Sequence, residues 1–173
     1  ALSYCSGDYV NFLNAGDYYA NSNVLDAVIN LIKKTNCDLV YGDLNVYSTH
    51  NDTEFSVRQW EAGKFKKNKL RYGWMPPHTS VFVRKNVLQE NDIFYDKKYQ
   101  ISGDYDWIIK LFKASKKTKY IPICITNMWP GGASNGSIAK QLKKFSEDYK
   151  ILKKHDFKYP LLTATMKRVR KVK

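Results

Sequence analysis

Apolar and polar residues recur along the chain with two periods, which predict strands and helices in alternation. The predicted strands are short β-rich runs at residues 9–13, 39–41, 79–84 and 120–125, with an extended continuation at 44–47. The predicted helices space their apolar residues three and four positions apart, after a cap within 21–23, over 104–114, and after a cap at 137. Strands that alternate with helices indicate one domain of the α/β class.

Two stretches depart from this alternation. Residues 48–77 are polar, basic and aromatic, and we predict a long functional loop there with room for one short helix. Residues 161–173 would form a helix with an apolar face and a basic face. The apolar set is Leu161, Leu162, Met166 and Val169, and the basic set is Lys167, Arg168, Arg170, Lys171 and Lys173. This pattern is typical of a helix on an anionic membrane surface, although a solvated basic end is the alternative.

Composition favours a folded protein with an anionic partner. The 173 residues are 43% hydrophobic, which is enough for a real core, and no apolar run is long enough to span a membrane. The net charge is +13, and residues 140–173 hold twelve Lys and Arg against three Asp and Glu, a local excess of 12 − 3 = +9. Nucleic acid, an anionic membrane and a diphosphate would all suit this charge. No zinc-finger, RNP or helix-turn-helix pattern is present, so no specific nucleic acid is expected.

Two carboxylates stand where chemistry, rather than packing, would place them. Asp17 follows the first apolar run, and the ends of buried strands line the ligand crevice of open α/β sheets. Asp104 opens an amphipathic helix, where it could act as a general base. Each also has a structural interpretation, Asp17 as a turn or cap residue and Asp104 as a charge at a helix N-terminus.

Four motifs occur in an order that resembles a known enzyme family. They are Gly7 to Asp17 (GDYVNFLNAGD), Asp38 to Asp43 (DLVYGD), Pro77-His78-Thr79, and Gly103 to Asp106 (GDYD). Together they resemble the second half of a family 2 glycosyltransferase of the GT-A fold, similar to enzymes that build bacterial surface polysaccharides. The resemblance implies an incomplete GT-A fold, a Rossmann-like mixed sheet flanked by helices, without the N-terminal nucleotide-binding βαβ units. It divides the chain into an acceptor- and metal-binding half at 1–158 and a basic amphipathic segment at 159–173.

The resemblance also implies an activity. Such an enzyme moves a sugar, with inversion, from a nucleoside-diphosphate sugar to a hydroxyl of a lipid-linked or polysaccharide acceptor. Asp17 would bind Mg²⁺ or Mn²⁺, with Asn14 as a neutral helper in place of the family's first aspartate. Asp104 would be the catalytic base, although Gly103 stands where the family has glutamate. Asp106 and Lys110 match the family's acidic and basic positions on the same helix.

Further residues would bind the donor. His78 lies where these enzymes often carry a histidine, and Trp74 could stack on a sugar. Gly131, Gly132 and Ser134 belong to a loop that resembles the one near the donor diphosphate. His78 could equally be a structural histidine. Asp43 could line the same pocket or close a tight turn, and we favour the turn.

The sequence leaves other functions open. The chain could instead be a silent glycosyltransferase remnant, or a basic module that binds nucleic acid or an anionic surface. A partner could supply the missing N-terminal half. We expect a cytoplasmic protein, peripheral at the inner face of the membrane, and no disulfide or zinc site among Cys5, Cys37 and Cys124.

Overall fold

The computed structural model describes residues 2–50, 53–129 and 137–170. The chain forms two compact units, each built from three segments. Unit 1 comprises Ala1–Phe65, Pro76–Ile93 and Leu111–Pro130, and unit 2 comprises Lys66–Met75, Phe94–Lys110 and Gly131–Lys173. The C-terminal helix belongs to unit 2, together with the preceding helix.

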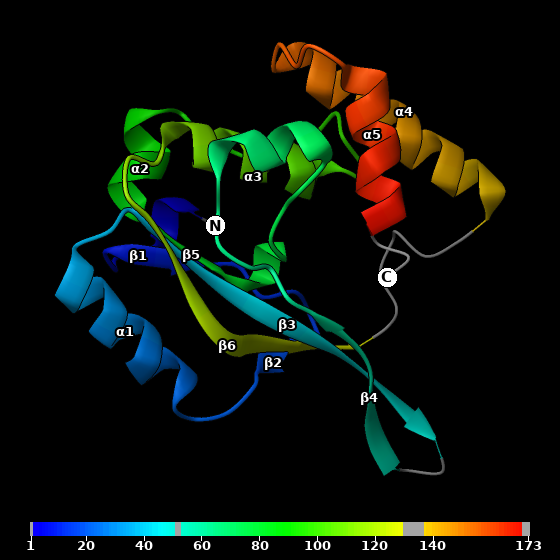
Figure 1. The fold of residues 1–173 in the computed structure, drawn as a ribbon. Coiled ribbons are helices and arrows are strands. Elements are labelled where there is room, and N and C mark those ends of the chain that lie inside the picture. The colour runs from blue at the N-terminus through cyan, green and yellow to red at the C-terminus, as the bar shows by residue number, and fades with distance from the viewer. Residues whose placement is uncertain (1, 51–52, 130–136, 171–173) are drawn as a thin grey trace. The chain divides into compact units, whose positions relative to one another are not determined.

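Unit 1 contains a mixed six-stranded sheet. Its strands are β1 (Tyr9–Asn11), β2 (Tyr18–Tyr19), β3 (Leu39–His50), β4 (Thr53–Trp60), β5 (Val81–Arg84) and β6 (Thr118–Met128). The order is β1-β5-β3-β6-β2, with β4 paired to β3. β3 and β6 are parallel and lie side by side along the sheet, whereas the other pairs are antiparallel (Figure 1). The expected mixed α/β architecture is confirmed.

One face of the sheet is covered by α1 (Val24–Thr35), the first predicted helix. Val24 and Val28 are each 1% exposed and pack with Val40 and Ile125 from β3 and β6. The helix ends at Asn36, whose φ of 44° lies in the left-handed region that asparagine tolerates. A Cβ at Gly42 would lie 2.8 Å from the Ile123 carbonyl oxygen, so the close pairing of β3 with β6 requires glycine there.

The other face of β3 carries an aromatic cluster, because successive side chains of a strand point to opposite faces. The Tyr41 ring meets Phe112 edge-on, with centroids 5.4 Å apart, and Phe65 meets Phe112 at 4.7 Å. Phe112 comes from the end of α3 (Gly103–Ala114), whose last residues belong to unit 1. The prediction of a helix over 104–114 is confirmed, and unit 1 buries apolar side chains on both faces of its central strand.

The prediction of a loop over 48–77 is wrong in its first part. β3 continues to His50 and β4 returns over Thr53–Trp60, so this region is largely a hairpin. A 3₁₀ helix, η2 (Lys67–Tyr72), fulfils the expectation of one short helix. The predicted strand over 79–84 is shorter, because η3 (His78–Ser80) precedes β5. Unit 1 also contains η1 (Leu2–Tyr4) and α2 (Lys85–Glu90).

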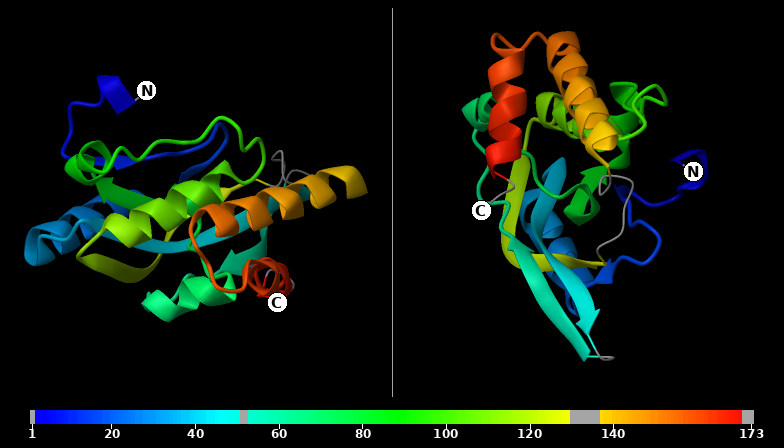
Figure 2. Two further views of the ribbon diagram at one scale, coloured as in Figure 1. Left: turned by 90° about the horizontal axis from the view of Figure 1, so that it is seen from above. Right: turned by 90° about the vertical axis from the view of Figure 1, so that its right-hand side faces the viewer.

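Unit 2 is helical. It contains η2, the start of α3, α4 (Ile138–Lys154) and α5 (Pro160–Val169), and the last two helices lie side by side (Figure 2). Pro160 occupies the first turn of α5, where its missing N–H costs nothing. η2 approaches α5 closely, because a Cβ at Gly73 would lie 2.6 Å from the Lys167 backbone.

Two expectations for these helices need correction. The predicted apolar stripe of α4 is buried only in its second half, where Ile151 and Leu152 are fully covered, whereas Ile138 is 79% exposed. Lys167 was expected on a solvated basic face of α5, but it is buried and pairs with Asp148 of α4 at 2.7 Å. Leu161, Leu162 and Val169 are exposed as expected. Lys171 and Lys173 lie outside the described residues, within which no helix is long and apolar enough to cross a membrane.

Candidate active site

Three of the predicted site residues come together in unit 1. The Asn14 side-chain amide donates to Asp17 Oδ2 at 3.1 Å and lies 3.4 Å from His78 Nε2. The turn that carries Asn14 and Asp17 is closed by the Asp17 N–H, which donates to the Asn14 carbonyl at 3.1 Å. Gly16 in this turn has a φ of 88°, a conformation that favours glycine. We call these three residues the Asn14–Asp17–His78 cluster.

Asn11 is the residue that aligns the two halves of this cluster. It lies at the end of β1, and its side-chain amide donates to the carbonyls of Thr79 and Val81, each at 2.8 Å. Tyr19 donates its hydroxyl to Asn11 Oδ1 at 3.1 Å. These bonds fix the chain after β1 beside η3, which carries His78. Sequence reasoning missed Asn11, because an asparagine inside a strand pattern gives no sign of a partner 70 residues away.

The electrostatics of the cluster centre on Asp17. Burial raises the pKa of Asp17, and the hydrogen bonds from Asn14 and the nearby His78 oppose that rise. Within residues 2–50, 53–129 and 137–170, no three His, Cys, Asp or Glu side chains gather as a metal-binding group. Asp17 supplies one carboxylate, and the Asn14 group beside it is the amide N–H, which is not a metal ligand. Mg²⁺ and Mn²⁺ can be held by one carboxylate where phosphates complete the shell. A metal at Asp17 would therefore need ligands from outside this cluster.

Asp43 has a structural position that the sequence did not reveal. It lies within β3, is 7% exposed, and accepts hydrogen bonds from the Ala62 N–H at 2.8 Å and the Tyr120 hydroxyl at 2.9 Å. Burial, followed by the bond to Asp43, raises the pKa of Tyr120 to about 12. The interpretation of Asp43 as the end of a turn is wrong, since its carboxylate joins β6 to the chain that follows β4.

Asp104 lies in unit 2, in the first turn of α3. It is partly exposed, and its Oδ1 accepts the Tyr105 N–H at 2.8 Å. The Asp104 charge adds to burial in raising the pKa of Tyr95, and it opposes the lowering of the Lys167 pKa by burial. The carboxylate is therefore near both side chains. An accessible carboxylate at a helix N-terminus can accept a proton, which is what a general base requires.

A buried glutamate holds the chain that leads into Asp104. Glu147 of α4 is 6% exposed and accepts the backbone N–H groups of Gln100, Ile101 and Ser102 at 3.2, 2.9 and 2.8 Å. Ser102 in turn accepts the Tyr105 and Asp106 N–H groups with its carbonyl. Sequence reasoning missed Glu147, because it lies among lysines on a predicted surface helix.

Asp106 serves the structure of unit 2. It is fully buried and pairs with Lys110 at 2.6 Å, His155 at 2.8 Å and Lys154 at 3.3 Å. Burial would raise the Asp106 pKa, but these partners outweigh burial and hold it well below its usual range. The acidic and basic positions at Asp106 and Lys110 thus bind each other, one helical turn apart.

The remaining predicted residues gain no support as parts of a site. Trp74 is 6% exposed, so its ring offers little surface on which a sugar could stack. Gly131, Gly132 and Ser134 lie outside the described residues. The Asn14–Asp17–His78 cluster and Asp104 belong to different units, and each is a candidate for one part of a reaction.

Comparison with known proteins gives a match in structure alone. No protein-family model matches the chain, and no curated protein matches it in sequence. The structure resembles S. aureus TarS 1-349 in complex with UDP-GlcNAc, with a TM-score of 0.59, 14% identity, 87% of this chain and 42% of that chain covered. The same TarS region with UDP gives a TM-score of 0.53 at 13% identity over 92% of this chain and 50% of that one. A longer TarS structure matches with a TM-score of 0.55 at 12% identity, over 88% of this chain and 25% of that chain.

These matches concern the fold, because their identities are far below the level at which a shared activity follows. The chain spans between a quarter and a half of the TarS chains that it matches. The expected fold class is confirmed: a mixed sheet flanked by helices that matches part of the GT-A fold of TarS.

Proposed function

We propose that this protein is an inverting glycosyltransferase that uses a nucleoside-diphosphate sugar. The observation that carries the proposal is the fold match over 87% of the chain to TarS in complex with UDP-GlcNAc. The partly exposed Asp104 and the Asn14–Asp17–His78 cluster add the two kinds of group that this reaction needs. The donor chemistry that the match favours is a uridine diphosphate sugar, and the sugar itself stays open.

Asp104 is the group that we propose for proton transfer. An acceptor hydroxyl oxygen attacks the anomeric carbon of the donor sugar while its proton passes to the Asp104 carboxylate. The bond from that carbon to the diphosphate oxygen breaks, and its electron pair leaves with the nucleoside diphosphate. Attack opposite the leaving group inverts the anomeric configuration.

Asp17 is the metal ligand that we propose, with Asn14 and His78 beside it. When bound, Mg²⁺ or Mn²⁺ would neutralise charge that develops on the departing diphosphate. In this proposal the Asn14 amide, which donates to Asp17, orients the carboxylate, and His78, which lies beside Asn14, donates to a phosphate or sugar oxygen.

The acceptor and location are the less constrained parts of the proposal. A lipid-linked or polysaccharide acceptor of a surface glycan fits an enzyme with a strongly basic C-terminal region. Exposed Leu161, Leu162 and Val169 on α5, among basic residues, favour a peripheral position on the anionic inner face of a membrane.

Binding of donor and product tests the proposal directly. Calorimetry with UDP and UDP-GlcNAc, with and without Mn²⁺, should show binding of both, and Mn²⁺ should strengthen it. Slow release of UDP from UDP-GlcNAc in the presence of Mn²⁺ would add support. If neither compound binds at millimolar concentration, the proposal fails. If both bind but no sugar is transferred to any glycan acceptor, the silent remnant becomes the better description.

A further inference from the structure

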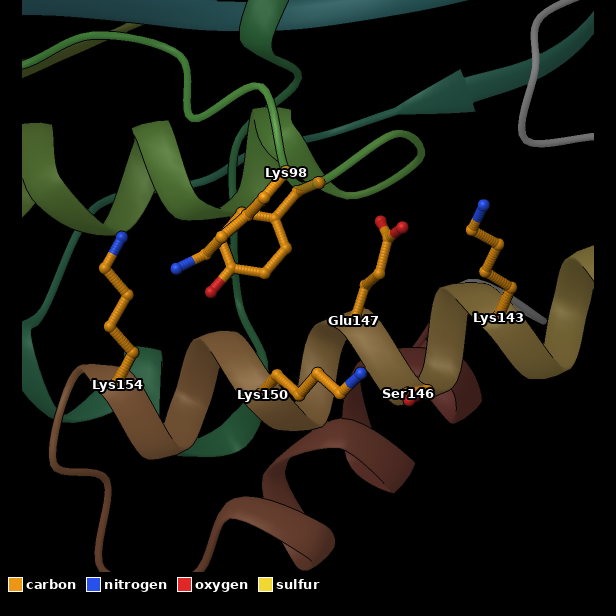
Figure 3. Close-up of a pocket in the computed structure, with 7 residues that line it drawn as sticks. Lys98, Lys143, Ser146, Glu147, Lys150 and Lys154 are labelled. Atoms are coloured by element: carbon orange, nitrogen blue, oxygen red, sulfur yellow. The ribbon is translucent and has the colours of Figure 1, made fainter.

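Unit 2 contains a pocket that the proposed reaction does not use. Its volume is about 530 Å³, which lies within the range of roughly 300–1,000 Å³ typical of small-molecule sites. The pocket is lined by Lys98, Tyr99, Lys143, Ser146, Glu147, Lys150 and Lys154. We call it the lysine pocket (Figure 3).

One face of α4 forms a wall of the lysine pocket. Lys143, Glu147, Lys150 and Lys154 follow one another at intervals of four, three and four residues, so they share one face of the helix. At about 1.5 Å of rise per residue, Lys143 and Lys150 stand about 10 Å apart along the axis. Figure 3 shows Lys143, Glu147 and Lys154 rising from α4 on the same side, toward the segment that carries Lys98.

The charges of this pocket do not balance. Its one carboxylate, Glu147, is already engaged by three backbone N–H groups. Lys98 and Lys154 pair with Asp96 at 3.3 and 3.2 Å. Lys143 contacts the neutral Gln100 side chain at 2.5 Å, and neither Lys143 nor Lys150 forms an ion pair within the described part of the chain. The lining residues therefore carry four ammonium groups against the single carboxylate of Glu147, with Asp96 beside two of the four.

Tyr99 holds the opposite end of the pocket in place. Its ring is 8% exposed, and the ammonium groups of Lys98 and Lys154 lie 5.0 and 5.6 Å from the ring centroid. Contact with an aromatic face and with Asp96 limits the motion of these two side chains. Positive charge therefore exceeds negative charge in the pocket, with Lys98 and Lys154 held beside Asp96 and Tyr99.

We propose that the lysine pocket binds the phosphate groups of an anionic acceptor, as a diphosphate or as neighbouring phosphodiesters. Lysine ammonium groups are compact charges that bind phosphate oxygens, and four of them around one pocket suit a ligand with more than one phosphate. The pocket is built on the segment that Glu147 holds at the start of α3, two residues before Asp104. That the ligand is the acceptor substrate rests on the proposed function, whereas phosphate binding by the pocket does not.

The first test uses inorganic pyrophosphate as the probe and calorimetry as the readout, without donor or turnover. The pocket variant is Lys143→Gln with Lys150→Gln, and the control is Lys153→Gln with Lys158→Gln, two exposed lysines of unit 2 that do not line the pocket. We expect the pocket variant to bind pyrophosphate about tenfold more weakly and the control to change less than about twofold. Equal weakening in both variants, or no binding by the wild type at millimolar pyrophosphate, would overturn the proposal.

The second test separates phosphate ligands from nucleic acid. A short single-stranded RNA and a phosphodiester-linked glycan oligomer should each be titrated at the same salt concentration. Competition of the glycan oligomer with pyrophosphate, lost in the pocket variant, supports the proposal. Tighter binding of RNA that depends on Lys143 and Lys150 overturns it in favour of a nucleic-acid site. A protein that binds pyrophosphate here but transfers no sugar would contradict the proposed function and leave the pocket assignment standing.

Discussion

At the scale of single residues, Asp17 is the side chain whose role can be tested most directly. Replacement by asparagine keeps the shape and the acceptor for the Asn14 amide but removes the charge that a metal needs. We expect Asp17→Asn to abolish the Mn²⁺-dependent part of UDP binding, measured by calorimetry. Asn14→Asp, which adds a second carboxylate, should strengthen the Mn²⁺-dependent part of UDP binding. Undiminished Mn²⁺ dependence in Asp17→Asn would leave Asp17 as a turn residue.

The pH dependence of Asp17 provides a second readout. Because burial raises its pKa, protons compete with the metal at a higher pH than for an ordinary aspartate, so Mn²⁺ affinity should begin to fall earlier on acidification. The effect of the raised Asp17 pKa on folding stability runs in the opposite direction. A raised carboxyl pKa favours the neutral form on folding, so this contribution is present below pH 3.8 and is lost as pH rises through the folded-state pKa. Asp17→Asn should therefore not lower the unfolding midpoint at pH 7.

Asp104 carries the second prediction at this scale. If its carboxylate takes the acceptor proton, Asp104→Asn should reduce sugar transfer by about 10²-fold or more with little change in donor affinity. Asparagine retains an oxygen for the Tyr105 N–H, so the start of α3 should survive. Glu90→Gln, an exposed carboxylate at the end of α2, is the control and should keep full activity. Transfer that persists in Asp104→Asn would assign Asp104 to the helix N-terminus alone.

At the scale of elements, Glu147 links α4 to the start of α3. Glu147→Ala would leave three backbone N–H groups without their acceptor, and a buried unsatisfied donor costs about 1–3 kcal/mol. Of the three bonds only that from Ser102 is fully buried, so we expect urea unfolding to show a loss of about 1–3 kcal/mol for Glu147→Ala, and a smaller loss for Glu147→Gln, which keeps one oxygen.

Sugar transfer gives Glu147 a second readout. The assay uses a temperature at which Glu147→Gln is fully folded. If Glu147 positions Asp104, the kcat of this variant for sugar transfer should fall by a larger factor than its KM changes. A loss of stability with unchanged kcat would mean that Glu147 holds the fold but not the base.

The elements that the sequence predicted well are those with strong local patterns. α1 and α3 have apolar residues at helical spacing, and β6 is a β-rich run that the structure extends to Met128. β4 was missed because its few apolar residues, such as Phe55 and Val57, stand among polar and charged ones in a stretch that is polar and basic overall. In the structure both side chains are about half exposed. Two β-rich runs separated by two residues were nevertheless a hairpin signal.

The candidate site residues could be predicted from the sequence, but the buried residues that hold the surrounding chain in place could not. Asn14, Asp17 and His78 were identified from motifs, and the structure brings them together across 64 residues of sequence. Asp43, Asp106 and Glu147 act through partners far along the chain, and local sequence does not reveal such partners. The same holds for Lys167, which looked like a surface charge until its distance to Asp148 was known.

At the scale of the whole molecule, a net charge of +13 favours binding to anionic partners and surfaces. Within unit 2, the lysine pocket is the proposed site for phosphate groups, whereas α5 presents apolar side chains among basic ones. These two features make separate predictions. Pyrophosphate binding should depend on the pocket lysines, and vesicle binding should depend on the leucines of α5.

The final prediction concerns binding to membranes. Deleting α5 is a poor test, because Thr163 and Ala164 are buried and unit 2 would lose part of its core. Leu161→Ser with Leu162→Ser changes two exposed side chains instead, at 59% and 56% exposure. Burying a leucine in an apolar phase stabilises binding by about 1.5–3 kcal/mol, so this variant should bind anionic vesicles at least about tenfold more weakly.

Co-sedimentation with vesicles measures this effect. Wild-type protein should sediment with phosphatidylglycerol vesicles, not with phosphatidylcholine vesicles, and salt should weaken the interaction because about 1 kcal/mol per basic residue comes from the surface charge. Phe55→Ser with Val57→Ser, which removes two similarly exposed side chains from β4 of unit 1, is the matched control. If both variants lose binding equally, the attraction is a general property of exposed apolar surface. If neither loses it, charge alone holds the protein to the vesicle and α5 has no role in anchoring it.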